Sequence, residues 1–130
     1  MVCLDTDILI GLLKGEEKAV SLARGLEGTG AAMKTTMVTA YELLKGVVSS
    51  SRPEENMLMV RDLLSSLSIL TLSYGSCELA SGIYSKLRAR GQIIGEFDML
   101  IAAMAMCSGE TLISRDKHFQ LVENLKIETW

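Results

Sequence analysis

The pattern of apolar and polar residues alternates between short apolar runs and spacings that repeat on one helix face. The run Val2–Leu4 is short, apolar and followed by an acid, which predicts a buried strand. The other predicted strands are Ala31–Met37, Ser68–Leu72, Thr111–Ser114 and Leu125–Trp130. Because segments with helical spacing separate these runs, the order predicts an α/β domain built on a parallel sheet.

Helical spacing of apolar residues fills the intervals between the strands. The predicted helices run from Ile8 to Leu13, Glu16 to Leu26, Val38 to Val48, Pro53 to Leu67, Ser76 to Arg90 and Met99 to Cys107, with a short turn or helix from His118 to Val122. Thr6 or Asp7 is expected to cap the first helix. The helix from Met99 is apolar nearly all round, which is typical of a central helix. Asp98 directly precedes it and is expected to mark its beginning.

Composition favours one domain, residues 1–130, with a core of its own, since 48% of the 130 residues are hydrophobic and 22% are charged. The most apolar stretch, Met99–Cys107, is far shorter than the roughly 20 residues that a bilayer-spanning helix needs. Cys3, Cys77 and Cys107 are odd in number and lack C-x-x-C spacing, which predicts reduced thiols and no cysteine-based zinc site. We therefore expect a cytoplasmic protein without a membrane span.

Charge and histidine content narrow the chemistry. The formal net charge is −3, whereas proteins that bind nucleic acid regardless of sequence usually present a basic surface. Either nucleic acid is not the substrate, or the acids are gathered where metal ions neutralise them. The single histidine, His118, excludes a site made of several histidines. It leaves one formal pairing with a serine or cysteine, for which no residue is marked as a nucleophile.

Three carboxylates stand where a parallel sheet binds its ligands, beyond the carboxyl ends of the strands, and a fourth could join them. Asp5 closes the first strand, Asp116 follows the fourth, and Asp98 opens the central helix. Glu42 lies inside the helix from Val38 to Val48 and would face the others if that helix packs near the strand ends. Each acid also has an ordinary explanation. Asp5 and Asp98 fit helix caps, Asp116 fits an Asx turn, and Glu42 fits a surface position.

The four acids together suit one chemistry. Neighbouring carboxylates raise each other's pKa unless a cation binds them. Oxygen ligands without histidine or cysteine select Mg²⁺ or Mn²⁺ over zinc. Such an ion lowers the pKa of its water and neutralises charge at phosphorus, so that phosphodiester hydrolysis needs no histidine base. Metal ions would then meet the phosphate first, while Arg115 and Lys117 either guide phosphate or are plain surface residues.

With these residues, the chain resembles the PIN-domain family and, within it, the VapC-like toxins of toxin–antitoxin pairs. The resemblance covers nearly the whole chain and is carried by Leu4–Asp7, Thr36–Gly46, Ile94–Ala103 and Thr111–Asp116 with Phe119. It implies a three-layer α/β domain in which helices flank a central parallel sheet of four to five strands.

The family pattern also implies a site and an activity. It assigns catalysis and metal binding to four acids, matched here by Asp5, Glu42, Asp98 and Asp116. Asp5 and Asp98 are the first choices for direct metal ligands. The resemblance further implies a Mg²⁺- or Mn²⁺-dependent endoribonuclease that acts on RNA, forms a homodimer and is silenced by a small antitoxin protein.

Several assignments stay open. Asp7 and Glu96 lie close in sequence to the matched acids and are further candidates, and Thr6 and Ser114 are candidates for holding the carboxylates or a water. A housekeeping RNA-processing nuclease and a non-catalytic PIN-like scaffold that binds RNA or protein are alternative functions. A phosphate-accepting signalling domain also clusters aspartates around Mg²⁺. That class needs a lysine on a late strand, which the segment 114–116 does not supply, and it leaves the glutamate at position 42 unexplained.

Overall fold

A sheet of five parallel strands forms the centre of the computed structural model, which describes residues 1–130. The strands are β1 (Val2–Leu4), β2 (Met33–Thr36), β3 (Ser68–Leu70), β4 (Thr111–Ile113) and β5 (Ile127–Glu128). Their spatial order is β3-β2-β1-β4-β5. The chain therefore moves outward from β1 to β3 and then returns to the other side of β1 at β4. Such a reversal opens a crevice at the carboxyl edge of a parallel sheet.

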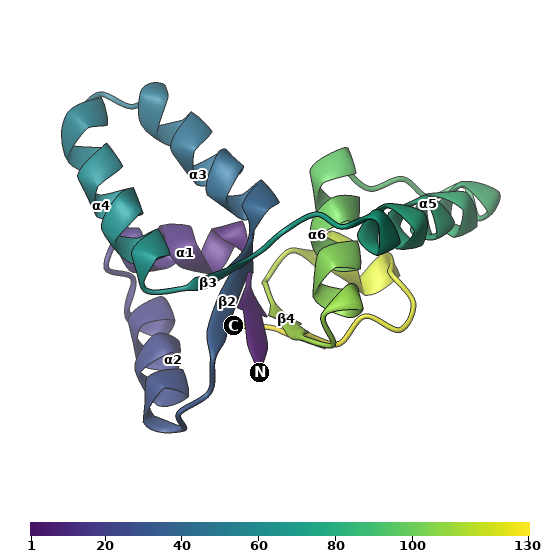
Figure 1. Ribbon diagram of the computed structural model, residues 1–130, viewed down its shortest axis with the longest axis horizontal. Coiled ribbons are helices and arrows are strands. Elements are labelled where there is room, and N and C mark those ends of the chain that lie inside the picture. The colour runs from purple at the N-terminus through teal and green to yellow at the C-terminus, as the bar shows by residue number, and fades with distance from the viewer.

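Helices cover both faces of the sheet. They are α1 (Thr6–Leu13), α2 (Glu17–Gly28), α3 (Met37–Val48), α4 (Pro53–Ser65), α5 (Tyr74–Ala89), α6 (Glu96–Cys107) and the 3₁₀ helix η1 (Lys117–Leu121). Figure 1 shows α1 to α4 on one side of the strands and α5, α6 and η1 on the other. The predicted three-layer α/β architecture is confirmed. None of the helices is both long enough and apolar enough to cross a bilayer.

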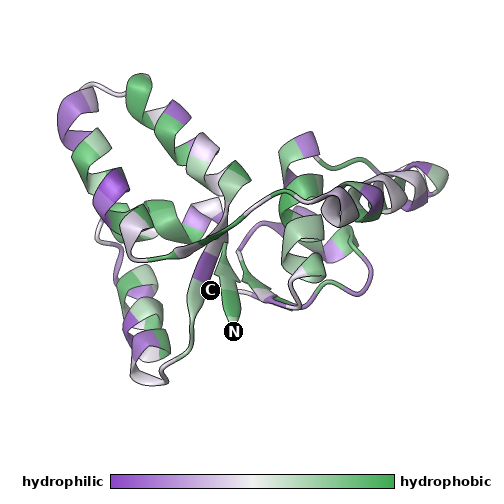
Figure 2. Ribbon diagram, viewed as in Figure 1, coloured by the Kyte–Doolittle hydropathy of each residue, from purple (hydrophilic) through white to green (hydrophobic).

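Two apolar clusters hold these layers together. Cys3 and Leu112 belong to the cluster under α5, α6 and η1, whereas Leu4 and Ile113 belong to the cluster under α1, α3 and α4. Consecutive strand residues thus enter opposite clusters, because side chains alternate across a strand that is buried on both faces. In α6, the residues Ile101–Ala103 are 0% exposed, which confirms the predicted central helix. Figure 2 shows α6 as mostly hydrophobic, whereas α2 and α4 mix hydrophobic with hydrophilic positions.

Several predicted boundaries differ from those of the structure, and two of these differences are described here. α6 begins at Glu96 with Gly95 at its N-cap position, so Asp98 lies within the first turn and does not precede the helix. The two acids in that turn stabilise the helix start by complementing the positive end of the helix dipole. The apolar run begins only after them, so its start placed the beginning of the helix too late. The last strand covers only Ile127–Glu128, shorter than the predicted segment, because its pairing with β4 spans two residues.

Candidate active site

The carboxyl edge of the sheet, at the reversal between β1 and β4, brings together four acids that we call the acidic cluster: Asp5, Glu42, Asp98 and Asp116. Asp5 directly follows β1, and Asp116 lies in the connection from β4 to η1. Glu42 comes from α3, and Asp98 comes from the first turn of α6. The side chains of Asp98, Asp116 and His118 place one ligand atom each within 4.8 Å of one another.

Asp5 is the buried member of the acidic cluster. It is 5% exposed, and its Oδ2 accepts a 2.7 Å hydrogen bond from Ser114 Oγ. Burial raises the pKa of Asp5 to about 7, and the negative charges of Asp7 and Asp98 add to the increase. The bond from Ser114 and a backbone bond from Thr6 act in the opposite direction. A negative charge at this position is therefore costly unless a cation stands beside it.

The beginning of α1 leaves the Asp5 carboxylate available to the cluster. Asp5 occupies the N-cap position of α1, but its side chain makes no capping hydrogen bond. The prediction that Thr6 or Asp7 caps this helix is wrong, because both residues already belong to its first turn. The extended backbone of Asp5, with φ −76° and ψ 169°, continues β1 directly into the helix.

Threonine hydroxyls hold Glu42 at the edge of the cluster. Thr6 Oγ1 donates a 2.8 Å hydrogen bond to Glu42 Oε1 and lies 3.2 Å from Thr39 Oγ1. Thr36 caps α3 by accepting the backbone N–H of Thr39 at 3.0 Å. These bonds join the first turns of α1 and α3. The predicted roles of Thr6 and Ser114 in holding carboxylates are confirmed.

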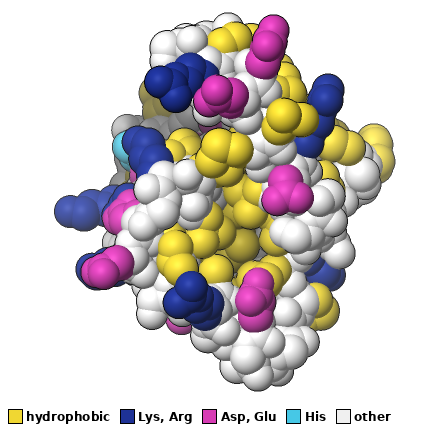
Figure 3. All heavy atoms as spheres, turned by 90° about the vertical axis from the view of Figure 1, so that its left-hand side faces the viewer, with side chains coloured by type: hydrophobic (Ala, Val, Ile, Leu, Met, Phe, Trp, Pro, Cys, Tyr) yellow, Lys and Arg dark blue, Asp and Glu magenta, His cyan; other side chains and the backbone are white.

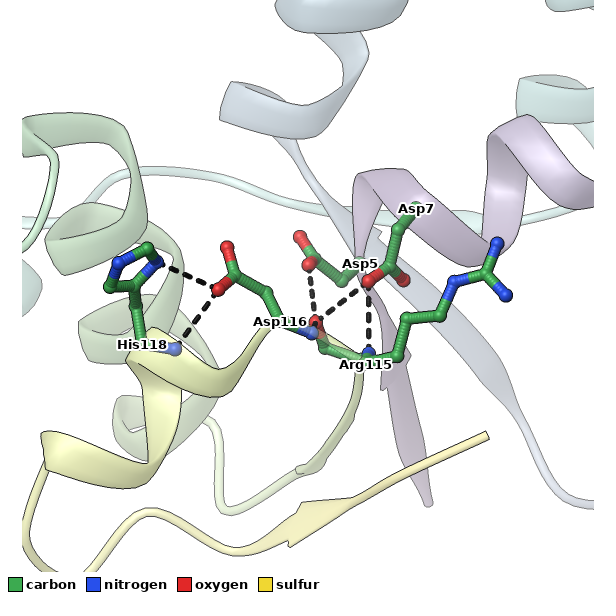
Figure 4. Close-up of polar contacts among 6 residues, drawn as sticks. Asp5, Asp7, Arg115, Asp116 and His118 are labelled. Atoms are coloured by element: carbon green, nitrogen blue, oxygen red, sulfur yellow. Dashed lines mark hydrogen bonds and ion pairs between the residues drawn. The ribbon is translucent and has the colours of Figure 1, made fainter.

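Asp98 and Asp116 face each other across the cluster. Partial burial raises the pKa of Asp98, and the charges of Asp116 and Glu42 raise it further, while His118 opposes them. Asp116 Oδ1 accepts the backbone N–H of His118 at 2.9 Å and lies 2.8 Å from His118 Nδ1. The ordinary explanation of Asp116 as an Asx turn therefore holds alongside its place in the cluster. Figure 4 shows the carboxyl groups of Asp5 and Asp116 pointing to the same side of the β4–η1 connection.

Sequence reasoning missed the position of His118 beside the acids. The signal that could have found it is its spacing, two residues after Asp116, which lets one carboxylate bind both the backbone and the ring of the same residue. His118 is exposed, so its ring lies at the outer edge of the cluster.

Two further candidates lie outside the cluster. Arg115 extends away from Asp116 in Figure 4 and forms a two-point ion pair with Glu16, at 3.1 and 3.2 Å. Its exposed guanidinium thus pairs with Glu16 in this structure, and a role in guiding phosphate stays a prediction. Glu96 is exposed and makes no hydrogen bond or ion pair with the cluster. Lys117 is exposed as well, as expected of a surface residue.

The donor set of the cluster suits a divalent cation. It consists of carboxylate oxygens, with a single imidazole that already faces Asp116. Hard oxygen donors of this kind bind small divalent ions, and the ion's charge opposes both the burial and the repulsion between acids that raise the pKa of Asp5 and of Asp98. None of the three free cysteines belongs to this group of possible ligands.

Comparison with known proteins agrees with this architecture. A sequence model of the family described as PIN domain matches residues 2–125. Ribonuclease VapC2 from Haemophilus influenzae is 34% identical over 98% of this chain and 96% of its own length. The tRNA(fMet)-specific endonuclease VapC from Shigella flexneri is 27% identical over 98% of this chain and 96% of its own. In the crystal structure of VapBC2 from Rickettsia felis bound to a DNA fragment from their promoter, one chain matches with a TM-score of 0.92 and 27% identity, covering 100% of this chain and 99% of that chain. This chain belongs to the PIN domain family.

Proposed function

We propose that this chain is a metal-dependent endoribonuclease that hydrolyses RNA phosphodiester bonds, and that it is the toxin of a toxin–antitoxin pair. The observation that carries the proposal is the convergence of four carboxylates at the carboxyl edge of the sheet, between β1 and β4. Relatives that match nearly the whole chain and are named ribonucleases support the RNA substrate. With RNA as its substrate, the chain is expected in the cytoplasm.

Asp5 and Asp98 are the first choices for holding Mg²⁺ or Mn²⁺, and Glu42 and Asp116 complete the site. The raised pKa of Asp5 and of Asp98 supports this choice, because a bound cation favours the charged form of each. A bound ion supplies neutralisation of charge at phosphorus and a lower pKa for a neighbouring water. The chain's own hydroxyl groups orient the acids, since Ser114 holds Asp5 and a threonine at position 6 holds Glu42.

Asp5→Asn and Asp98→Asn test the metal role. Each change keeps the size of the side chain and removes its charge, so Mn²⁺ binding measured by calorimetry should weaken and RNA cleavage should fall by about 100-fold or more. Asp62→Asn, an exposed acid on α4, is the matched control and should change neither quantity. Undiminished cleavage in both site variants would exclude the proposed role. Metal binding without cleavage in the wild type would favour the non-catalytic scaffold.

A groove between α1, α3 and α4 supports a protein partner for this site. It has a volume of about 310 Å³, and its walls include Leu13, Val47, Met59 and Val60. Figure 3 views this half of the molecule and shows hydrophobic side chains gathered in a hollow that charged side chains border. Glu42 also lines the groove, so a bound segment would end beside the acidic cluster. We infer that the apolar face of the antitoxin binds here and blocks access to the acids.

Met59→Glu tests the antitoxin groove. Met59 is 48% exposed and lines the groove, whereas its neighbour Leu58 is 67% exposed and does not. Met59→Glu should weaken binding of a small protein encoded beside this chain by about 10-fold or more, because it places a charge among apolar contacts. Leu58→Glu, the matched control, should leave binding unchanged, and both variants should still cleave RNA. If no small DNA-binding protein is encoded there, a housekeeping nuclease is favoured instead.

An exposed aromatic pair supports the proposed homodimer. Tyr41 and Phe97 pack edge to face with ring centroids 5.8 Å apart, yet remain 52% and 41% exposed. Exposed aromatic pairs of this kind are enriched at protein interfaces. Light scattering should give twice the mass of one chain for the wild type, and the mass of a single chain would exclude the dimer.

A further inference from the structure

Trp130, which follows β5, is held in place close to the acidic cluster. Its indole Nε1–H donates a 2.9 Å hydrogen bond to Asp7 Oδ1. The guanidinium of Arg115 stacks over the ring, with Cζ 3.8 Å from the ring centroid, and Glu16 anchors that guanidinium through two bonds. The ring also lies against α1, where a Cβ added at Gly11 would come within 3.0 Å of the ring atom Cη2. Stacking, packing and a hydrogen bond thus fix the indole in one orientation.

Asp7 connects this tryptophan to the connection between β4 and η1. While Oδ1 accepts the indole N–H of Trp130, Oδ2 accepts the backbone N–H of Arg115 at 2.9 Å and lies 3.1 Å from Ser114 Oγ. Figure 4 shows the Asp7 carboxyl group directed toward the Arg115 backbone. Both oxygens of Asp7 are therefore engaged by protein donors.

Ser114 carries this arrangement into the acidic cluster. Its hydroxyl donates to Asp5 Oδ2 at 2.7 Å and accepts the backbone N–H of Asp116 at 3.1 Å. The hydroxyl has one proton, and both Asp5 and Asp7 are within its reach. Because two N–H groups already donate to Asp7, the shorter bond to Asp5 takes the proton. The hydrogen bonds of Asp7 thus decide which acid Ser114 orients.

We propose that Trp130 is a positioning residue for the acidic cluster and acts through Asp7. The indole N–H holds Asp7 in the orientation that binds the Arg115 backbone, and this bond keeps the β4–η1 connection, with Asp116, beside Asp5. The inference rests on the proposed nuclease function, because it assigns a role toward the same site. If the proposal is correct, loss of the indole N–H at position 130 weakens metal binding at the acidic cluster, although Trp130 does not contact the acids of that cluster.

The variant Trp130→Phe separates positioning from packing. Phenylalanine keeps an aromatic ring under Arg115 and against α1 but has no N–H for Asp7. Leu125→Ala is the matched control, because Leu125 lies in the same segment and packs against the core on the other face of the sheet. Three quantities are measured: hydrogen exchange of the Arg115 amide, Mn²⁺ affinity by calorimetry, and kcat and KM for RNA cleavage.

For Trp130→Phe we expect Arg115 amide exchange to rise by about 10-fold, Mn²⁺ affinity to fall by about 10-fold and kcat to fall with little change in KM. Leu125→Ala should lower the melting temperature and leave the other quantities unchanged. In Asp7→Asn, the amide oxygen can still accept the indole N–H, but the NH₂ group faces the N–H of Arg115 and cannot accept it. We therefore expect the same loss of Mn²⁺ affinity as in Trp130→Phe. The fluorescence of the chain's single tryptophan should stay unchanged.

Two results would overturn the proposal. In the first, Trp130→Phe has the same Arg115 amide exchange and Mn²⁺ affinity as the wild type. In the second, Leu125→Ala changes both quantities as much as Trp130→Phe does. Failure of the proposed function is distinguishable from either. If the wild type neither binds Mn²⁺ nor cleaves RNA, the nuclease proposal fails. The exchange of the Arg115 amide and the tryptophan fluorescence still report whether Trp130 orders the β4–η1 connection.

Discussion

Asp5 is 5% exposed, and burial raises the pKa of its carboxyl group to about 7. The hydrogen bond from Ser114 favours the charged form, but it does not offset the loss of water around the carboxylate. Near neutral pH the metal-free chain therefore holds this group partly protonated. A cation beside it reverses the preference, because a bound ion is the largest local charge in such a site.

The stability of the metal-free chain should fall as pH rises from about 4 to about 7. Over this interval folded Asp5, with its pKa at about 7, keeps a proton that an unfolded aspartate, with a pKa of about 3.9, has lost. The stabilising contribution is complete below about pH 4 and is lost as pH passes through about 7. Asp5→Asn removes this dependence, so its melting temperature in chelator should exceed that of the wild type by several degrees at about pH 8.

Mn²⁺ provides the control for this prediction. At about pH 8 the ion should raise the melting temperature of the wild type, because it binds the folded chain only, and should have little effect on Asp5→Asn. An equal difference between wild type and variant at about pH 4 and at about pH 8 would contradict the raised pKa of Asp5.

Among the helices and strands, α1 and α2 approach each other closely at Gly11. A Cβ added there would come within 3.0 Å of Ala19 Cβ in α2 and within 3.0 Å of the Trp130 ring. Gly11 is buried, and because it has no side chain, α1, α2 and the indole ring can pack closely against one another there. By contrast, Gly46 in α3 is exposed and has nothing within 4 Å of an added Cβ.

Gly11→Ala and Gly46→Ala should therefore change stability in opposite directions. Alanine favours a helix interior over glycine by about 1 kcal/mol, and at position 46 nothing opposes this gain. At position 11, overpacking costs about 1–3 kcal/mol, which exceeds the gain and displaces the Trp130 ring. Urea unfolding measures both free energies, and tryptophan emission reports the displacement. Equal stabilisation by both substitutions would show that Ala19 and the Trp130 ring shift to admit the new methyl group without a cost in stability.

For the molecule as a whole, an ion pair between a partly buried lysine and a fully buried glutamate joins the two halves of the sheet. Lys34 Nζ in β2 lies 2.7 Å from Oε1 of Glu110, the residue before β4, and β1 lies between these two strands. The Glu110 side chain is 0% exposed, and its Oε2 has no hydrogen-bond partner. Taking the Glu110 charge out of water is costly, so the pair adds little net stability, whereas losing Lys34 leaves the buried charge of Glu110 uncompensated.

Lys34→Met should destabilise the chain by about 3–5 kcal/mol, because it leaves Glu110 buried and unpaired. The double variant Lys34→Met/Glu110→Met should recover most of this loss, since two apolar side chains of similar length replace the pair. Urea unfolding of the single and double variants measures the coupling. Lys126→Met, which removes an exposed lysine, is the control. A loss at Lys34 no larger than at Lys126 would contradict the importance of the pair.

Local patterns were enough to predict the five strands, the parallel sheet and the place of three acids, Asp5, Asp98 and Asp116, on its ligand-binding side, whereas Glu42 joined them only on the condition that its helix packs near the strand ends. Strands buried on both faces need continuous apolar runs, and helices between them force parallel pairing, so acids that follow the strands meet at one edge. The identity of the family followed from residues in these same segments. Thr6 and Ser114 could be named as candidates because each lies close to an acid along the chain. The acids that they bind, Glu42 and Asp5, lie 36 and 109 positions away, so these pairings needed the folded structure.

Contacts between distant segments needed the folded structure. Trp130 and Asp7 are 123 positions apart, and Lys34 and Glu110 are 76 apart. No period in the chain encodes such pairs, because they depend on the order of the strands and on which helix covers which face. The same holds for Asp98, whose direction depends on where α6 begins and on the acids that other elements bring to it. Periodicity describes each element alone, and an acidic cluster made of four segments forms only once the sheet has ordered them.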